Sequence, residues 1–569
     1  MKRVSHLLAV ATVCAACTAP SSSTPAPQSL YAPSWAALNE TVHGRLFRGT
    51  PFAAPCFDGD GAACSALRAG YTDEWTRASA AGAWINTQWE TCQATGEQCL
   101  LSDGGAGTFS DGSTCEQGSV PDYFIDVRDP GDAAAGFAFA RETGLPLVIK
   151  NTGHDYKGRS SAPGSLGLWT HNLKNISLEA DFVPEGCSEK ADGVEKVVIV
   201  GAGAQWADGY AFAEENNLTL VGGSDRSVGM AGGWLQGGGH GLLAPAMGLG
   251  VDRVLQYRVV TPDGTYRIAN LCQNADLFWA LRGGGGGTFG VVIEAAILAS
   301  PRVPLQTVTV VVPAGNKDLS RQLWSVMVAN GVQWAEQGWG ANAMSNVAVY
   351  VNPVLTKEEA AESMAPFIEF GEKLTAAGVE GVKVVLAEVP SWGTFFAAFS
   401  TAHVAAVGNS LALASRLINR DNFATSEDQR ALVDALLAAD DATPGLIILA
   451  TTPVAFPSAG EDTSVTPLWR ESIYHITVVS PWEVNASIEE KQAHYDLASA
   501  SINNLRRITK HGAYSNEADV NEPEFETSFW GDNYAALLSI KQKYDPEGLL
   551  DCWQCVGWKQ DDDRFRCYL

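Results

Sequence analysis

Charged side chains are scarce in this chain of 569 residues, and most of those present are acidic. Charged residues make up 18% of the sequence, no long run of one sign occurs, and 64 Asp and Glu against 38 Lys and Arg give a net charge of −26. With 46% hydrophobic residues, this composition is typical of a globular protein. The shortage of basic residues argues against nucleic acid and anionic membranes as partners, because both would repel the chain.

Several nucleotide- and metal-binding motifs are missing or incomplete. The sequence has no GxxxxGK[ST] motif, so we do not expect an NTPase. Residues 197–200 have the pattern of a strand and lead into Gly201-Ala202-Gly203, but Trp206 replaces the third glycine of a Rossmann fingerprint. Cys552 and Cys555 form a CxxC pair, yet no second CxxC or pair of histidines accompanies it, so we expect no metal site.

Long hydrophobic runs are also rare. The apolar run at residues 7–16 follows Lys2 and Arg3 and is bordered by small residues, which is typical of a signal peptide. The alternative, a transmembrane anchor, is disfavoured because the run is too short to span a bilayer. We therefore predict a signal peptide at residues 1–20 and a secreted, extracellular protein without a membrane partner.

The cysteines agree with export. Two of the 12 lie in the predicted signal peptide, and the remaining ten are an even number, which suggests disulfides. They cluster towards the two ends of the chain, so we expect local pairs there, including in a leader and N-terminal extension at residues 21–116. Four N-x-S/T sequences predict surface glycosylation: Asn39, Asn175, Asn217 and Asn485.

The most informative stretch is residues 150–168, KNTGHDYKGRSSAPGSLGL, which follows a short apolar run at 145–149. The run has the pattern of a buried strand, and Gly153 and Gly158 mark the turn that holds His154. Glycine allows the backbone to approach a ligand closely, and successive N–H groups of such a turn can face a phosphate. The pattern predicts a loop that grips a cofactor and presents one imidazole to it. The alternative is a surface turn with a solvated histidine.

Two further glycine-rich stretches strengthen the cofactor hypothesis. Residues 227–243 read SVGMAGGWLQGGGHGLL, and residues 276–292 read DLFWALRGGGGGTFGVV. The aromatic and aliphatic residues around the five-glycine run indicate packed backbone rather than a linker. Together with Gly153-His154-Asp155-Tyr156, these stretches resemble the PCMH-type FAD-binding domain of the vanillyl-alcohol-oxidase and berberine-bridge-enzyme-like flavoproteins.

The C-terminal part carries the same resemblance. Tyr514-Ser515-Asn516-Glu517 and the KQKYDP sequence at residues 541–546 are similar to the C-terminal segments of berberine-bridge-like proteins, in particular a fungal, secreted, isoamyl-alcohol-oxidase-like branch. The resemblance implies an α+β, two-domain fold. It has a discontinuous FAD-binding domain at residues 117–302, to which residues 503–569 return, and a substrate domain at residues 303–502.

The residues between the two FAD-binding segments have their own pattern. Strand-like runs alternate here with helical runs. The helical runs are at residues 319–337, 357–376, 429–439 and 488–507. This alternation predicts an α+β layer in which an antiparallel sheet faces the flavin and helices cover its back.

The resemblance also implies roles for individual residues. His154 corresponds to the histidine that binds the 8α-methyl group of the flavin. Some relatives carry a second link from a cysteine three residues before a Val-Gly pair; here that position, before Val228-Gly229, is Asp225, so we predict a single covalent link. The residues expected to bind FAD are Asn151, Thr152, Gly153, His154, Asp155, Gly158, Val228, Gly229, Gly233, Gly238, Gly239, His240, Gly241, Val292 and Asn516.

The expected function is that of an oxidase. A flavin takes a hydride from carbon at N5 and returns two electrons to O2, giving H2O2, while the protein positions and tunes it. A small alcohol or related molecule is the expected substrate, O2 the acceptor, and the protein a monomer. The hydroxyl proton needs a base, and the candidates are Tyr514, Glu517, His475 and Tyr156. The alternative for each of these candidates is a structural role. We expect His171 and His240 to have structural roles or to form hydrogen bonds near the flavin, and not to act as bases.

Three other functions remain open at this point. The same fold can serve as a dehydrogenase or oxidative cyclase of secondary metabolism, or as a carbohydrate oxidase. A flavin-binding protein without turnover is the alternative from another class, and the intact glycine stretches argue against it.

Overall fold

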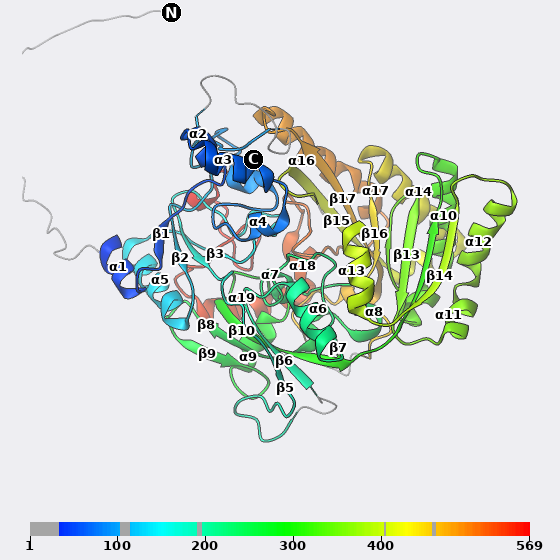
Figure 1. Cartoon of the computed structure of the whole chain (residues 1–569), viewed down its shortest axis with the longest axis horizontal. Helices are drawn as coiled ribbons and strands as arrows, with labels where there is room; N and C mark the ends of the chain where they lie inside the picture. Colours follow the sequence, from blue (N-terminus) through cyan, green and yellow to red (C-terminus); the bar gives the residue numbers. More distant parts are fainter. Residues whose placement is uncertain (1–33, 103–113, 191–195, 403–405, 458–462) are drawn as a thin grey trace, which may run out of the picture.

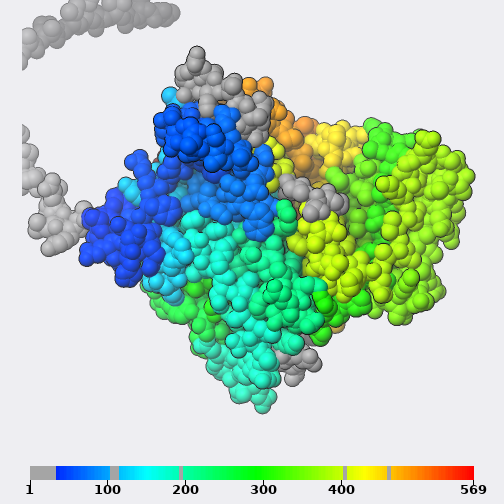
Figure 2. Space-filling model, viewed as in Figure 1, coloured from blue at the N-terminus to red at the C-terminus, as the bar shows by residue number. Residues whose placement is uncertain are grey.

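The computed structural model describes residues 34–102, 114–190, 196–402, 406–457 and 463–569, so the predicted signal peptide lies outside the described residues. Two sheets form one half of the molecule, and a seven-stranded sheet with its helices forms the other (Figure 1). The two halves are in contact across the middle of the molecule, and the N-terminal extension, in blue, lies over the first half (Figure 2). The predicted two-part α+β fold is confirmed.

The first sheet carries the strand that leads to His154. Its order is β1-β2-β4-β3, and β4 pairs in parallel with both β2 and β3. Helix α5 (Pro130–Thr143) connects β2 to β3, begins with a capping box at Asp129 and ends at Gly144, whose φ of 72° suits glycine. The strands are β1 (Leu46–Arg48), β2 (Tyr123–Asp126), β3 (Leu147–Lys150) and β4 (Leu166–Trp169).

The second sheet is antiparallel throughout. It runs β5-β6-β10-β8-β9, with β7 paired to β10. Because β6 lies between antiparallel partners, Gly201-Ala202-Gly203 does not belong to a Rossmann unit. The strands are β5 (Ile176–Glu179), β6 (Lys196–Gly201), β7 (Leu218–Thr219), β8 (Val254–Val260), β9 (Tyr266–Ala269) and β10 (Val291–Pro301). The associated helices are α6 (Trp206–Glu215), α7 (Gly233–Gln236), α8 (Ala244–Met247) and α9 (Ala275–Leu281).

The third sheet, with seven strands, is the central sheet of the second half. Its order is β14-β11-β13-β12-β16-β17-β15, with every pair antiparallel. The strands are β11 (Leu305–Val311), β12 (Gly340–Ala343), β13 (Val347–Asn352), β14 (Lys383–Val389), β15 (Ser410–Asn419), β16 (Ile447–Ala450) and β17 (Ser472–Trp482). Strands β12 and β15 have no counterpart in the sequence prediction.

Helices cover one face of this sheet, as the sequence predicted (Figure 1). Two predicted helices are each broken into two, at Met364 and at Ile502. The helices of this half are α10 (Lys317–Glu336), α11 (Lys357–Ser363), α12 (Ala365–Ala376), α13 (Trp392–Ala402), α14 (Ser426–Ala442), α15 (Leu468–Glu471), α16 (Ile488–Ser501) and α17 (Asn503–Arg506).

The ends of the chain pack on the first half. Helix α19 (Tyr534–Tyr544) contacts α9, and Trp530 of α18 (Phe525–Trp530) donates to the carbonyl of Gly283. The N-terminal extension contains α1 (Trp35–Thr41), α2 (Ala54–Phe57), α3 (Gly61–Ala69) and α4 (Glu74–Ala78). Among the helices of the described ranges, none has the length and apolar character needed to cross a membrane.

All ten cysteines of the described residues form disulfides. Three are local, Cys56–Cys64, Cys99–Cys115 and Cys552–Cys555, and two are not, Cys92–Cys567 and Cys187–Cys272. The expected local pairs are confirmed by three of the bonds, and the other two join segments that are distant in the sequence but adjacent in the fold. The Cys552–Cys555 bond also leaves that CxxC pair without thiolates to bind a metal.

Candidate functional site

A cavity of about 560 Å³ lies between the two halves and is lined by residues of both. Ligand sites commonly have volumes of about 300–1,000 Å³. The His154 loop, the backbone of the glycine-rich stretches and the C-terminal residues Tyr514, Asn516 and Glu517 form one side. Residues of the seven-stranded sheet, on the face turned towards the first half, form the opposite side together with Phe399 of α13.

His154 lies on the cavity wall with its ring held by polar neighbours. Its Nε2 atom is 2.6 Å from Ser227 Oγ and 3.4 Å from Asp225 Oδ1. The Ser227 hydroxyl donates its one proton to a carboxylate, since both Asp225 and Glu74 accept from it at 3.2 Å. Ser227 Oγ must then accept from His154, so Nε2 carries the ring proton and Nδ1 keeps a free lone pair. In the described part of the chain, Nδ1 has no hydrogen-bond partner.

The glycine backbone around His154 fits a flat ligand. At Gly229 a Cβ atom would lie 2.4 Å from Asn151 Oδ1, and at Gly286 it would lie 2.7 Å from the Cα atom of Gly233, so both positions leave no room for a side chain. At Gly233 a Cβ would enter open space in the cavity. Asn151 Oδ1 is buried without a partner among the described residues, and a ligand N–H group would satisfy it. The residues present therefore fit a cofactor such as FAD.

Glu517 joins two imidazole rings at the other end of the cavity. Its Oε2 atom is 2.8 Å from His475 Nε2 and 3.2 Å from His240 Nε2, and His240 Nδ1 is 3.1 Å from Thr451 Oγ1. Burial alone would raise the pKa of Glu517, but the charge of His240 and hydrogen bonds from both rings outweigh it and hold the pKa below its usual range. Glu517 is therefore ionised at neutral pH. Burial lowers the pKa of His475, which keeps that ring neutral.

The same three side chains are of the types that bind metal ions, and their ligand atoms lie within 4.8 Å of one another. A metal would need the lone pair of His475 Nε2, which would move the ring proton to Nδ1. His475 Nδ1 is buried and has no acceptor in the described part of the chain, and a metal-bound histidine ordinarily has one. The arrangement fits a hydrogen-bonded cluster better than a metal site.

Two tyrosines, Tyr156 and Tyr514, line the cavity, and they differ in their surroundings. The Tyr156 hydroxyl has no hydrogen-bond partner among the described residues, and burial followed by the charges of Glu517 and Asp225 raises its pKa. The Tyr514 hydroxyl accepts from Asn516 Nδ2 at 2.7 Å and from the Gly239 amide at 3.4 Å. Asn516 also donates to the carbonyl of Gly233 at 2.9 Å. Tyr514 thus supports the glycine backbone, whereas Tyr156 is free to contact a ligand.

The structure brings most of the predicted site residues together. Four of them do not line the cavity: Gly158, Gly238, Gly239 and His475. Gly158 packs against the Trp89 ring, where a Cβ would lie 2.3 Å from the nearest carbon, and His475 is buried behind Glu517. The predicted residues that line it are Asn151, Thr152, Gly153, His154, Asp155, Tyr156, Val228, Gly229, Gly233, His240, Gly241, Val292, Tyr514, Asn516 and Glu517.

Sequence reasoning missed Ser227 and Thr451, which contact the two histidines of the site. His240 was expected to bind the cofactor or to form hydrogen bonds near it, and in the structure its ring joins Glu517 to Thr451 at the cavity wall. Ser227 stands next to the Val228-Gly229 pair, which was a usable signal. Thr451 ends a strand about 200 residues from His240, and nothing local marks it.

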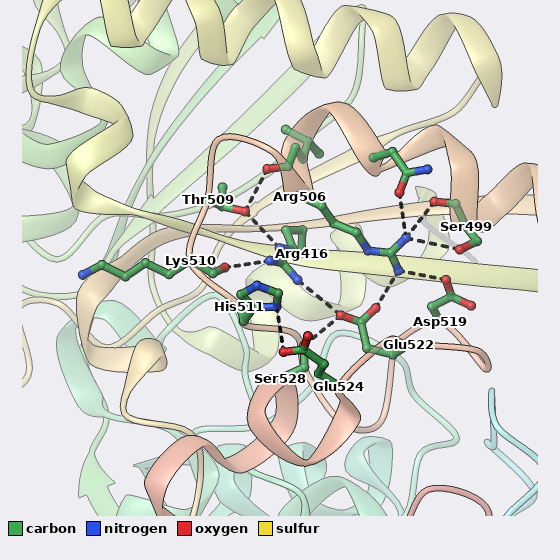
Figure 3. Close-up of polar contacts among 12 residues, drawn as sticks. Arg416, Ser499, Arg506, Thr509, Lys510, His511, Asp519, Glu522, Glu524 and Ser528 are labelled. Carbon is green, nitrogen blue, oxygen red and sulfur yellow. Dashed lines mark hydrogen bonds and ion pairs between the residues drawn. The ribbon is translucent and has the colours of Figure 1, made fainter.

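A buried ion-pair network fixes the segment that carries Glu517 (Figure 3). Arg416 of β15 contacts Glu522 at 3.2 Å, and Arg506 of α17 contacts Glu522 at 2.6 Å and Asp519 at 2.9 Å. Arg416 and Glu522 have side-chain exposures of 1% and 0%. The network ties the returning chain to the third sheet a few residues after Glu517.

Two family profiles match the chain. One, described as "FAD binding domain", matches residues 121–270 and so includes His154. The other, described as "Berberine and berberine like", matches residues 513–556 and includes Tyr514, Asn516 and Glu517.

Whole-chain comparisons agree with the profiles. The chain is 36% identical to the FAD-linked oxidoreductase ffsJ of Aspergillus flavipes, over 92% of each sequence. It is 30% identical to the bifunctional decalin synthase calF of Penicillium decumbens, over 92% of this chain and 90% of that one. Among solved structures, the VAO-type flavoprotein MtVAO615 of Myceliophthora thermophila superposes with a TM-score of 0.81 at 26% identity, covering 93% of this chain and 97% of that one.

Proposed function

The chain belongs to the FAD-linked oxidoreductases of the vanillyl-alcohol-oxidase and berberine-bridge-enzyme-like family, and on this premise we propose that it is a secreted oxidase with FAD bound covalently through His154 alone. Its substrate would be an alcohol or related small molecule, with O2 as the electron acceptor. The observation that carries the proposal is that one cavity holds both an imidazole with a free Nδ1 and an ionised carboxylate at its other end.

The environment of His154 supports covalent attachment. Formation of a bond from imidazole to carbon requires a ring nitrogen with a free lone pair, and Ser227 leaves Nδ1 in that state. A single link is supported by the position of Asp225, which lines the cavity where some relatives have cysteine. No other cysteine of the described residues can replace it, because all of them form disulfides.

The cluster around Glu517 supports removal of a hydroxyl proton. A carboxylate with such a low pKa is a weak base by itself, but it stabilises positive charge on an adjacent imidazole. His240 lies on the cavity wall, and Thr451 can pass a proton to its Nδ1 atom. We infer that His240 takes the proton, Glu517 stabilises the imidazolium, and His475 holds Glu517 in place. Tyr156 offers a hydroxyl to the substrate.

Bound FAD would supply the redox chemistry, accepting a hydride from carbon and passing two electrons to O2. The glycine backbone and Asn151 would hold it, and the polar groups around His154 would orient the attached ring. The disulfides support an oxidising compartment and so secretion.

The linkage is tested with His154→Ala. The wild-type protein should keep its yellow colour in the pellet after acid precipitation, whereas the variant should release FAD to the supernatant. His511→Ala, a change at an exposed histidine (58% of its side chain) away from the cavity, serves as the control and should behave as wild type. Flavin that stays with the His154→Ala pellet would refute the attachment site.

The role of this cluster in proton removal is tested with Glu517→Gln, which removes the negative charge that would stabilise the imidazolium of His240. Anaerobic reduction of the flavin by a panel of alcohols, sugars and phenols should slow about 10²–10⁴-fold, the usual contribution of general base catalysis. His475→Gln should slow it less, because that residue acts through Glu517. A Glu517→Gln protein that reduces its flavin at the wild-type rate would exclude the cluster from proton removal.

A dehydrogenase or oxidative cyclase is the second candidate, and the likeness to a decalin synthase is the observation that favours it. The acceptor separates the two functions. Reoxidation of the reduced flavin by O2 in stopped flow should be fast for an oxidase and slow for a dehydrogenase.

A further inference from the structure

The face of the third sheet that is turned towards the first half forms a wall of the cavity, and α13 covers another part of this face. Side chains alternate along a strand, so one set packs under the helices and the next set faces the cavity. On β16, for example, Ile448 and Ala450 join the helix-covered core, while Ile447 and Leu449 line the cavity. The aliphatic side chains of this wall are Met344, Leu413, Ile447, Leu449 and Val479.

These five side chains face the cavity and not a hydrophobic core. In the part of the chain that the structure describes, none of them joins any of the hydrophobic cores. Their apolar surface faces the cavity, and removing such surface from water is favourable by about 25 cal/mol per Å². An apolar ligand would gain this energy, whereas a ligand covered with hydroxyl groups would lose hydrogen bonds to water against the wall.

Polarity along the wall changes in one direction. On this side of β17, the buried His475 contacts Glu517, and Thr477 and then Val479 follow it on the cavity wall, roughly 7 Å apart in succession. Leu413 is directly opposite Val479 on β15, so the far end of the row is aliphatic on two strands. No charged side chain is among the residues of this sheet that line the cavity.

We propose that the substrate is an uncharged, amphiphilic alcohol whose hydroxyl lies at the Glu517 end and whose hydrocarbon body packs on this wall towards Val479. The assignment of the hydroxyl end rests on the proposed function, because the proton-accepting cluster defines it. The assignment of the hydrocarbon body does not, because it follows from the side chains of the wall. A saccharide would place its hydroxyls against Leu413 and Val479.

The binding part is tested on the holoenzyme with tertiary alcohols. They have no hydrogen on the carbinol carbon, so they bind without being oxidised, and binding is followed as a change in the flavin absorbance spectrum. Dissociation constants are measured for a series with alkyl chains of increasing length. Each added methylene group that reaches the wall should tighten binding about fourfold. A series without any dependence on chain length, or maltose binding more tightly than the longest alcohol, would overturn the proposal.

Near-isosteric variants test the wall itself. Val479→Thr exchanges a methyl group for a hydroxyl at nearly constant volume and should weaken binding of the longer alcohols about tenfold, because the hydroxyl loses water without gaining a partner. Val385→Thr is the matched control: Val385 lies on β14 of the same sheet, is 50% exposed and is not part of the cavity. It should leave the dissociation constants unchanged. Equal effects of the two variants on the dissociation constants would show that the wall is not part of the binding site.

Turnover separates this inference from the proposed function. Primary alcohols with long chains could bind without bleaching the flavin anaerobically, while the tertiary series behaves as expected. This outcome would support binding of the hydrocarbon body on the wall and refute alcohol oxidation. If alcohols and sugars bleach the flavin equally well and chain length has no effect, the proposed oxidation is supported and the proposed binding of the hydrocarbon body on the wall is refuted.

Discussion

Single residues decide whether the cavity can hold a flat ligand, and Gly233 is the clearest case. It begins α7, its carbonyl accepts from Asn516, and its α-carbon borders open space. Many other glycines of the chain are required by contacts: a Cβ at Gly158 would meet Trp89, and one at Gly203 would lie 2.0 Å from the carbonyl oxygen of His171. A change at Gly233 therefore tests ligand binding with little effect on packing.

Gly233→Ala should weaken FAD binding about tenfold, because the new methyl group enters the space of the ligand and overpacking costs about 1–3 kcal/mol. The measurement uses a His154→Ala background, in which binding is reversible and flavin fluorescence reports the dissociation constant. Gly61→Ala is the control, since Gly61 also begins a helix, α3, with open space at its Cβ position, and does not line the cavity. If both changes alter FAD affinity equally, Gly233 has no contact with the cofactor.

At the scale of elements, the position of Glu517 depends on how the returning chain is fastened to the third sheet. Glu522 forms ion pairs with Arg416 of β15 and Arg506 of α17 (Figure 3). All three side chains are largely buried. Replacing a whole buried ion pair by apolar residues is often harmless, but removing one partner leaves an uncompensated charge.

Glu522→Gln should therefore lower the free energy of unfolding by about 3 kcal/mol. Glu336→Gln makes the same change in an exposed pair with Arg420, with side-chain exposures of 53% and 48%, and should cost about 0.5 kcal/mol or less. Urea unfolding of the two variants gives the comparison. Similar losses for both would mean that the network in Figure 3 does not fasten the segment.

At the scale of the whole molecule, residues from the N-terminal extension and from the C-terminal segment contact each other next to the His154 loop. Cys92 is bonded to Cys567 across 475 residues, and the neighbouring Tyr568 donates to the carbonyl of Lys157 at 2.8 Å. Arg159 donates to the carbonyls of Trp553 and Gln554, each at 3.1 Å. The C-terminal residues thus support the loop that presents His154.

Loss of the long disulfide should cost more than loss of a short one. If disulfides stabilise by restricting the unfolded chain, Cys92→Ser/Cys567→Ser lowers the free energy of unfolding by about 3–5 kcal/mol. The Cys56–Cys64 bond joins residues only 8 apart, so Cys56→Ser/Cys64→Ser should lower it by about 2 kcal/mol. Guanidinium unfolding measures both. The first variant should also show a smaller fraction of acid-stable flavin, and an equal or larger loss in the second variant would contradict this role.

The sequence alone determined the features that depend on consecutive residues. The turn at Gly153-His154 and the glycine-rich stretches are local patterns, so they can be recognised along the chain. They led to the cofactor hypothesis, and their resemblance to a known family implied the role of His154 and the FAD-binding half. Strand β15 was not predicted, because it is buried at every position and lacks the alternation that marks a strand with one exposed face.

Only the tertiary structure decided which side chains meet. His240, His475 and Glu517 come from a loop, a strand and the C-terminal segment, and their contacts lower the pKa of Glu517. The proton position on His154 likewise depends on Ser227 and the carboxylates behind it. Hydrogen bonds and charges act through space over a few ångströms, and the order of residues in the chain does not specify those distances until the fold is formed.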